Sequence, residues 1–394
     1  MARREHSRVT PGGLIAAAAI GVGGLLAAAA ITGSVIAVVF ARTVVTPPRR
    51  REEDVHILAH NDSTITLSAT LDSMTPGQYS LWFGRDTGHA RVGEIISYTD
   101  RTVTRDLLGV TRGSLEGAVR GRLSGWFYLS PEDLGFPHED VTVQTDLGAA
   151  PAWLIPAETT SSRWVIGVHG RAVRREETLR AVPVFREAGY TSLLVSYRND
   201  GDAPGTSDNR YSLGDTEWKD VEAAIQFAID RGAERVVLMG WSMGGATVLQ
   251  ALTRSPLAAV VTGVVLESPV VDWVTALHYQ GVAHKLPRVV RLGILTLLSS
   301  KWSQFLTGQG SPIDLRRLDI VRHAGELHTP ILLLHSDDDG FVPATASRAL
   351  ALERPDIVTF ESFTTARHTK LWNYDAYRWN GAISRWLEKL DAPN

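Results

Sequence analysis

The spacing of apolar and polar positions changes twice along the chain. No residue from 14 to 41 is charged. Between residues 55 and 137, short runs alternate apolar and polar positions, and Gly, Asp and Pro separate them. After Pro137, continuously apolar runs alternate with segments in which apolar residues recur every three or four positions. These patterns predict a membrane-spanning helix, a small β-rich module and an α/β domain.

The uncharged N-terminal stretch has the length of a transmembrane helix. About 28 residues, each rising about 1.5 Å, exceed the ~30 Å hydrocarbon core. The alternative is a cleavable signal peptide, because Arg3, Arg4 and Arg8 precede the stretch, but the apolar part of such signals covers only about 7 to 15 residues. We expect a basic tail (1–13), a retained single-pass helix (14–41) and a linker (42–54). Arginines flank both ends, so the positive-inside rule is nearly balanced; we place the catalytic domain outside the cytoplasm.

The pattern from residue 138 to 394 predicts a mostly parallel, eight-stranded sheet with helices on both faces. Residues 141–145 and 152–155 flank a turn and predict an antiparallel hairpin at the sheet edge. A long insertion at about 273–328 interrupts the alternation and is expected to form a cap over the pocket. The six remaining strands are predicted at residues 164–168, 191–196, 235–239, 263–266, 330–334 and 357–360.

Composition narrows the possible functions. The formal net charge is -3 and the two signs of charge are interspersed, so no basic surface for nucleic acid is expected. The chain has no cysteine, which excludes disulfides, thiolate metal sites and a cysteine nucleophile. Oligomeric state stays open.

The sharpest local motif is Gly240-Trp241-Ser242-Met243-Gly244-Gly245. It follows an apolar strand and precedes a predicted helix, which is the context that a G-x-S-x-G nucleophile elbow requires. Small flanking residues are needed because the serine sits on a sharp, strained turn. We therefore predict that Ser242 is a nucleophile, with Gly240 and Gly244 as the elbow glycines.

A serine hydroxyl needs a base to remove its proton and an acid to orient that base. The predicted strand 330–334 leads into Asp337-Asp338-Asp339, so an acid emerges at the carboxyl end of a strand. His368 lies on a polar loop between the last predicted strand and the C-terminal helix. We predict that His368 is the base and that one of the three aspartates is the acid.

The tetrahedral intermediate of acyl transfer needs N–H donors for its oxyanion. The amide after the nucleophile, that of Met243, is one expected donor. The other is expected from the loop after the third strand, where Gly170 permits close approach and Arg171 supplies its main-chain N–H. The Arg171 side chain is interpreted as a solvated surface group, with a substrate carboxylate or phosphate as the alternative partner.

Together these motifs make residues 138 to 394 resemble the α/β-hydrolase superfamily, nearest its acylaminoacyl-peptidase-like and monoacylglycerol-lipase-like branches. The segment Leu213 to Val221 and the elbow carry the resemblance. It implies hydrolysis through an acyl-enzyme, with no metal and no organic cofactor. The D-x-x-V-P ending seen in relatives favours Asp339 as the acid, with Asp337 and Asp338 as alternatives. Arg171 departs from the small or apolar residue of many relatives.

Four functions remain possible on this basis. We favour a membrane-tethered esterase acting on a small or lipid-like acyl substrate, since residues 14–41 would hold the site near amphiphiles. An aminopeptidase-like enzyme would need an acidic side chain for the substrate amine, for which Glu267 or Asp272 are candidates. An acyltransferase would use the same serine with an alcohol or amine acceptor. A non-catalytic scaffold is the fourth possibility.

Overall fold

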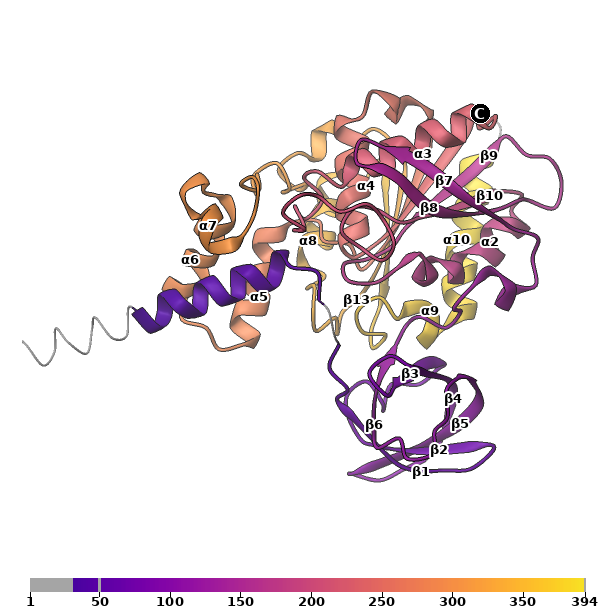
Figure 1. Cartoon of the computed structure of the whole chain (residues 1–394). Helices are drawn as coiled ribbons and strands as arrows, with labels where there is room; N and C mark the ends of the chain where they lie inside the picture. Colours follow the sequence, from indigo (N-terminus) through magenta and orange to yellow (C-terminus); the bar gives the residue numbers. More distant parts are fainter. Residues whose placement is uncertain (1–30, 49–50, 393–394) are drawn as a thin grey trace, which may run out of the picture.

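The computed structural model describes residues 31–48 and 51–392. A small barrel precedes a larger α/β domain, and the two pack against each other (Figure 1). Six strands close the barrel in the order β1-β2-β5-β4-β3-β6, and alternate side chains fill its interior. The strands are β1 (Val55–His60), β2 (Thr64–Ser68), β3 (Tyr79–Phe83), β4 (Gly88–Tyr98), β5 (Thr102–Arg112) and β6 (Arg120–Ser124).

The α/β domain is built on an eight-stranded sheet with the order β14-β13-β12-β11-β9-β10-β8-β7. The predicted edge hairpin is confirmed, because β7 and β8 pair antiparallel with Thr145 opposite Gly148. Strands β9 to β14 pair in parallel with one another, as their continuous apolar runs predicted. The strands are β7 (Glu139–Thr145), β8 (Gly148–Ile155), β9 (Arg163–Val168), β10 (Thr191–Val195), β11 (Arg235–Trp241), β12 (Val261–Glu267), β13 (Ile331–Ser336) and β14 (Val358–Phe363).

Helices cover both faces of this sheet because successive strand residues point to opposite sides. Leu238 belongs to the core on one face, whereas Val237 and Met239 belong to the core on the other. One face is covered by α3 (Trp218–Asp230), α4 (Met243–Arg254) and α8 (Thr345–Glu353), and the other by α2 (Val182–Glu187), α9 (Leu371–Tyr374) and α10 (Ala376–Asp391).

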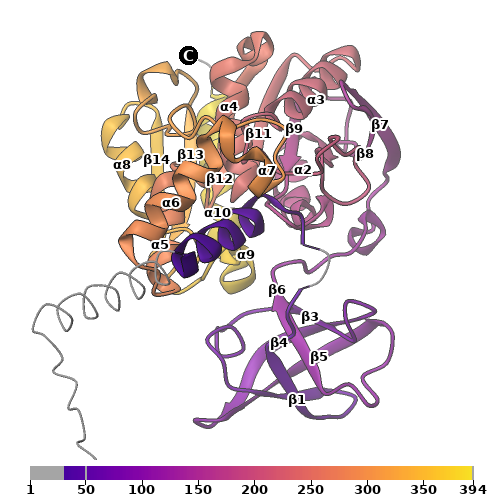
Figure 2. The same cartoon turned by 60° about the vertical axis from the view of Figure 1, so that its left-hand side comes forward.

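The insertion forms a helical lobe at one side of the domain (Figures 1 and 2). Its helices are α5 (Trp273–Ala283), α6 (Arg288–Ser299) and α7 (Gln304–Thr307). Residues 31–45 form a further helix beside it, and Ala37, Ala41 and Val45 are buried in the main core. Residues 14–30 of the predicted membrane helix lie outside the described residues. Along 31–48 and 51–392, none of the helices has both the length and the apolar character for a membrane span.

The barrel docks on the loop and helix that follow β14. Gln78 and Asn373 exchange two hydrogen bonds of 2.9 Å, and the Asn373 amide also donates to the carbonyl of Gly125. Asp72 of the barrel forms ion pairs with Lys370 at 2.7 Å and Arg367 at 3.6 Å. These contacts place the barrel next to the loop that carries His368.

Candidate active site

The nucleophile elbow has the geometry that its glycines predicted. Ser242 lies between β11 and α4 with φ 51° and ψ -116°, a strained conformation for a residue with a side chain. A Cβ on Gly244 would lie 2.3 Å from the carbonyl oxygens of both Val168 and His169. A Cβ on Gly240 would lie 2.7 Å from the backbone of Gly244. Only glycine fits at these two positions, so the local sequence dictates the turn.

Three side chains from separate loops meet at the carboxyl ends of β11, β13 and β14. The His368 Nε2 lies 3.0 Å from the Ser242 Oγ, and its Nδ1 lies 2.7 Å from Asp339 Oδ2. Ser242 and Asp339 are buried, while His368 is partly exposed. In this arrangement the imidazole can accept the hydroxyl proton while the carboxylate orients the ring.

Asp339 is held as a carboxylate by several donors. Its Oδ1 accepts the amides of Phe341 and Val342, both at 2.8 Å. Burial opposes ionisation, but the charge of His368 and the contacts with His368 and His335 outweigh it, so the pKa of Asp339 lies well below its ordinary value. The group therefore stays ionised across the neutral range.

The other two aspartates of this loop face different partners. Asp337 pairs with Arg348 and accepts from Ser362. Asp338 accepts from the Ser336 hydroxyl and the Arg367 amide. Neither contacts His368, so the geometry favours Asp339 among the three.

The expected oxyanion donors flank the serine. Met243 begins α4 immediately after Ser242, so its amide has no carbonyl to bond within the helix. Gly170 comes so close that an added Cβ would lie 3.4 Å from the Ser242 Cβ. The Gly170 amide donates to buried Glu177 at 2.7 Å, which fixes the loop and leaves the next amide, that of Arg171, for a substrate oxygen.

The Arg171 side chain differs from its interpretation as a solvated surface group. Its guanidinium donates to the carbonyls of Thr43, Val44 and Thr46, at the C-terminal end of the helix 31–45. Those carbonyls lack partners within the helix and carry the negative end of its dipole. Arg171 therefore links the N-terminal helix to the oxyanion loop.

The pocket beside His368 has a volume of about 520 Å³ and opens between the two domains. The barrel contributes Asp72, Leu123 and Ser124, and the linker contributes Pro48 and Arg51. No described residue of the insertion 273–328 lines this pocket, although Gln280 donates to the Phe341 carbonyl at 2.6 Å. The expected cap over the pocket is thus replaced by the barrel, because the barrel docks on the His368 loop.

The two acids considered for a substrate amine are committed elsewhere. Glu267 is buried and accepts the indole N–H groups of Trp241 and Trp379, both at 2.9 Å. Asp272 caps α5 by accepting the amides of Val274 and Thr275. Neither offers a free carboxylate to an ammonium group.

Two contributors to the site were not predicted. The His335 Nε2 donates to the Val342 carbonyl at 3.0 Å and lies 3.3 Å from Asp339 Oδ2, and the Nδ1 lies 2.8 Å from the Ser347 hydroxyl, so His335 helps to hold the acid in place. Glu177 orders the Gly170 loop, as described above. The sequence offers no distinguishing signal for Glu177, and the only signal for His335 is its place shortly before the acid loop. Within residues 31–48 and 51–392, no group of three His, Asp or Glu side chains forms a metal site.

Comparison with known proteins gives two regions of similarity. Residues 56–124, which make up the barrel, match a domain of unknown function, DUF8805. The uncharacterized protein YfhR of Salmonella typhimurium is 26% identical over 210 residues, which cover 50% of this chain and 63% of that protein. The chain therefore spans less than two thirds of the length of this curated relative.

Solved structures share the fold of the α/β domain. The esterase Pf2001 of Pyrococcus furiosus is 18% identical, with a TM-score of 0.52, and the match covers 67% of this chain and 95% of the esterase. Residues 165–376, more than half of the chain, match the alpha/beta hydrolase family. The chain belongs to the alpha/beta hydrolase family.

Proposed function

We propose that the protein is a serine hydrolase that cleaves carboxylic esters, with Ser242 as nucleophile, His368 as base and Asp339 as orienting acid. The continuous chain of hydrogen bonds from Asp339 through His368 to Ser242 carries this proposal. In related folds, such a chain raises the reactivity of a hydroxyl that is otherwise a weak nucleophile.

The reaction follows from the positions of these groups. His368 takes the proton of Ser242 as the oxygen attacks the ester carbonyl, and the amides of Met243 and Arg171 bind the oxyanion. His368 then gives the proton to the departing alcohol, leaving an acyl group on Ser242. Water, deprotonated by the same imidazole, releases the acid and restores the serine.

Ester hydrolysis is favoured over aminopeptidase activity because Glu267 and Asp272 are already bonded within the protein. A site for a free ammonium would need an unpaired carboxylate close to the serine. The likeness to the esterase Pf2001 agrees with this choice at the level of the fold.

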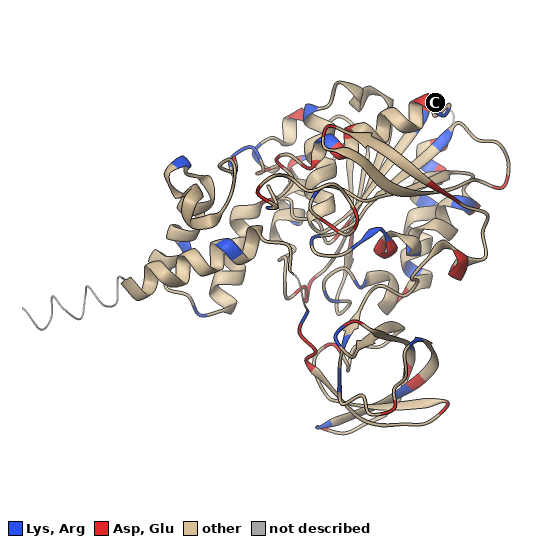
Figure 3. Cartoon of the chain, in the orientation of Figure 1, with Lys and Arg blue, Asp and Glu red and all other residues tan. Residues whose placement is uncertain are grey.

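We further propose that the helical lobe rests on the non-cytoplasmic surface of a membrane, with the uncharged residues that precede Ala37 as the tether, since Ala37 and Ala41 are buried in the protein core. Val289 of α6 is 75% exposed, Phe305 of α7 is 79% exposed and Val35 of the adjoining helix is 57% exposed. Between Asp272 and Asp314 the sequence has no acidic residue, and Figure 3 shows only basic residues among the charges of the lobe. An apolar surface with basic neighbours suits an anionic lipid surface.

Activity-based labelling tests the hydrolase proposal. The full chain in detergent should react with a fluorophosphonate and hydrolyse 4-nitrophenyl esters, and the Ser242→Ala variant should do neither. Ser192→Ala is the matched control, since Ser192 is also a buried serine of the central sheet. Labelling that persists in Ser242→Ala would refute the assignment. Addition of a short alcohol separates hydrolysis from acyl transfer, because a hydrolase releases mainly free acid in both cases.

A further inference from the structure

A second cleft adjoins the pocket of His368. It has a volume of about 1040 Å³ and lies between the barrel, the linker and the loops after β9 and β10. Both hollows are lined by Pro48, Arg51 and residues 171–173, so they lie next to each other, and the smaller one reaches the proposed catalytic histidine. Six arginines line the larger cleft: Arg51, Arg112, Arg122, Arg171, Arg174 and Arg210.

Three of these arginines already have partners in the protein. Arg122 pairs with Asp86 at 2.7 Å, Arg171 caps the N-terminal helix, and Arg210 donates to backbone carbonyls, including that of Asn209 at 3.0 Å. Their positive charges add to the electrostatic potential of the cleft, but their N–H groups are largely bonded to other parts of the protein.

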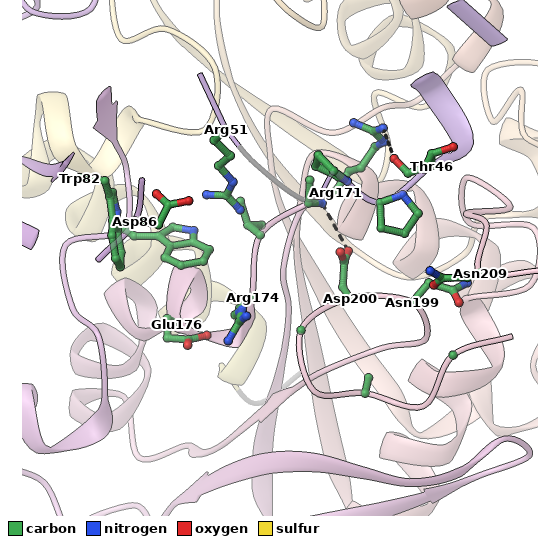
Figure 4. Close-up of a pocket in the computed structure, with 18 of the residues that line it drawn as sticks. Thr46, Arg51, Trp82, Asp86, Arg171, Arg174, Glu176, Asn199, Asp200 and Asn209 are labelled. Carbon is green, nitrogen blue, oxygen red and sulfur yellow. Dashed lines mark hydrogen bonds between the residues drawn. The ribbon is translucent and has the colours of Figure 1, made fainter. Parts of the chain in front are cut away.

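The remaining three are available to a ligand. Arg51 lies 4.8 Å from the ring centre of Trp126 and, within the described part of the chain, has no ion pair and no side-chain hydrogen bond. It reaches into the cleft between Trp82 and Arg171 (Figure 4). Arg174 is half-exposed and touches Asp202 only at 4.0 Å. Arg112, also at the rim, is exposed.

The acids of the cleft do little to neutralise these arginines. Burial raises the pKa of Asp200 to about 7, and its carboxylate already accepts the Tyr211 hydroxyl and the Ala172 amide. Burial also raises the pKa of Glu176. Both carboxyls favour the neutral form more than exposed acids do, so the cleft keeps an excess of positive charge.

Two tryptophans, one in the barrel and one just after it, form part of the wall of the cleft. Trp82 is 5% exposed and Trp126 is 7% exposed, and the indole Nε1 of each lacks a hydrogen-bond partner among the described residues. Both tryptophans line the cleft. The nitrogen atoms themselves are covered by protein, so the tryptophans contribute aromatic surface to the cleft rather than donors to a ligand.

We infer that the cleft binds an anionic oxygen group, a carboxylate or phosphate, on the substrate whose ester bond is cleaved at Ser242. The inference rests on the proposed function and adds the substrate class: a carboxylic ester carrying a second, negatively charged group. Arg51 and Arg174 hold the anion through charge-assisted hydrogen bonds, while the ester reaches the adjoining pocket. The linker and the loop after β9 thereby select the substrate, and the barrel forms the facing wall of the cleft.

Matched ester pairs test the inference on the full chain. The first pair is 4-nitrophenyl hexanoate and mono-4-nitrophenyl adipate, which differ by a terminal carboxylate on the acyl side. The second pair, 4-nitrophenyl hexanoate and 3-carboxy-4-nitrophenyl hexanoate, places the charge on the leaving group. We expect roughly a tenfold higher kcat/KM for the anionic member of at least one pair, falling as salt is added.

Substitutions of single arginines test which residues cause the preference for anionic esters. Arg51→Gln and Arg174→Gln should each reduce the anionic-to-neutral ratio roughly threefold to tenfold, mainly through KM. Arg51→Glu should reverse it in favour of a cationic ester. Arg316→Gln, an exposed arginine outside the cleft, is the control and should keep the wild-type ratio. Circular dichroism melts verify that each variant folds. Equal rates for all esters in the wild type, or a ratio insensitive to every cleft substitution, would overturn the inference.

A binding measurement separates this inference from the hydrolase proposal. Calorimetric titration of Ser242→Ala with adipate should show binding that Arg51→Gln weakens. If the protein binds adipate but the wild type hydrolyses no ester, the anion site is supported and the hydrolase proposal is rejected. If the wild type hydrolyses esters but shows neither adipate binding nor a charge preference, the hydrolase proposal is supported and the anion site is rejected. Vesicles distinguish the source of the anion: faster fatty-acid release from phosphatidylglycerol than from phosphatidylcholine assigns a lipid head group, and a preference confined to adipate assigns a soluble ester.

Discussion

The triad region and the arginine-lined cleft use their polar groups in opposite ways. Ser242, His368 and Asp339 each have a partner within the protein: the acid accepts two amides and the histidine bridges the serine and the acid. In the cleft, Arg51 has no ion-pair or hydrogen-bond partner among the described residues. Reactive groups must be oriented before substrate arrives, whereas a recognition site can wait for the ligand to complete its bonds.

The largest effect is expected in the triad, where each side chain already has its hydrogen-bond partners within the protein. Asp339→Asn should lower kcat by about 10⁴-fold, because an amide no longer selects the tautomer in which His368 can accept a proton from Ser242. Steady-state ester hydrolysis measures this. Asp337→Asn is the control, since Asp337 pairs with Arg348 away from the histidine, and it should stay near wild type. A comparable loss in both variants would contradict the choice of acid.

A substitution in the nucleophile elbow should also have a large effect, in this case on the stability of the protein rather than on its activity. Gly244→Ala places a methyl group 2.3 Å from two backbone carbonyl oxygens that cannot move independently. Overpacking of this kind costs about 1 to 3 kcal/mol of unfolding free energy, to be read from urea denaturation. Gly325→Ala has nothing within 4 Å of the added carbon and should change stability by less than about 0.5 kcal/mol. If the Gly244→Ala variant were as stable as the wild type, the loop that contains Val168 would have to move to make room for the methyl group.

The cleft is expected to make the stability depend on pH. The pKa of Asp200 is raised to about 7 in the folded protein, against 3.8 ordinarily, so the folded state holds its proton more tightly than the unfolded state. Its stabilising contribution is complete below about pH 4 and is lost as pH rises through about 7, by at most about 1.4 kcal/mol per pH unit.

Asp200→Asn removes this dependence. Urea denaturation from pH 4 to 8 should therefore show a smaller loss of stability with rising pH in Asp200→Asn than in the wild type. Asp202→Asn, at an exposed neighbouring position, should follow the wild-type curve. Parallel curves for all three proteins would mean that Asp200 ionises normally.

The contact between the barrel and the loop that carries His368 should give the smallest effect. Asp72→Asn removes the ion pairs with Lys370 and Arg367, which are partly solvated, and should cost about 0.5 to 1 kcal/mol. The difference should shrink in high salt, since screening weakens such pairs. Asp100→Asn, in an exposed turn of the barrel, serves as control. A loss of several kcal/mol would instead mean that barrel docking depends on this one carboxylate.

Local patterns predicted much of the α/β domain and of the candidate site. Apolar runs located β9 to β14, because strands buried on both faces need no polar positions. The glycines around Ser242 predicted the elbow, and the order of Ser242, Asp339 and His368 placed them at adjoining strand ends. These features depend on short stretches of chain or on the general rule that parallel strands present their carboxyl ends together.

Other features depend on contacts between segments far apart in the sequence. The β-rich character of residues 55–137 was predicted, but closure of the barrel and its docking beside His368 were not, since pairing of distant strands leaves no periodicity of its own. The link between Arg171 and the helix 31–45 joins positions more than 120 residues apart.

By itself, the sequence determined the hydrolase fold class, the serine and the histidine with which the chemistry is proposed, and the loop that carries the acid, because a nucleophile elbow and buried parallel strands leave clear local patterns in the sequence. Only the tertiary structure decided which of three aspartates meets His368, what Arg171 bonds, and which arginines surround the substrate space. Those outcomes follow from where the barrel and the N-terminal helix come to rest, and packing between separate elements is set by the shape and charge of whole surfaces.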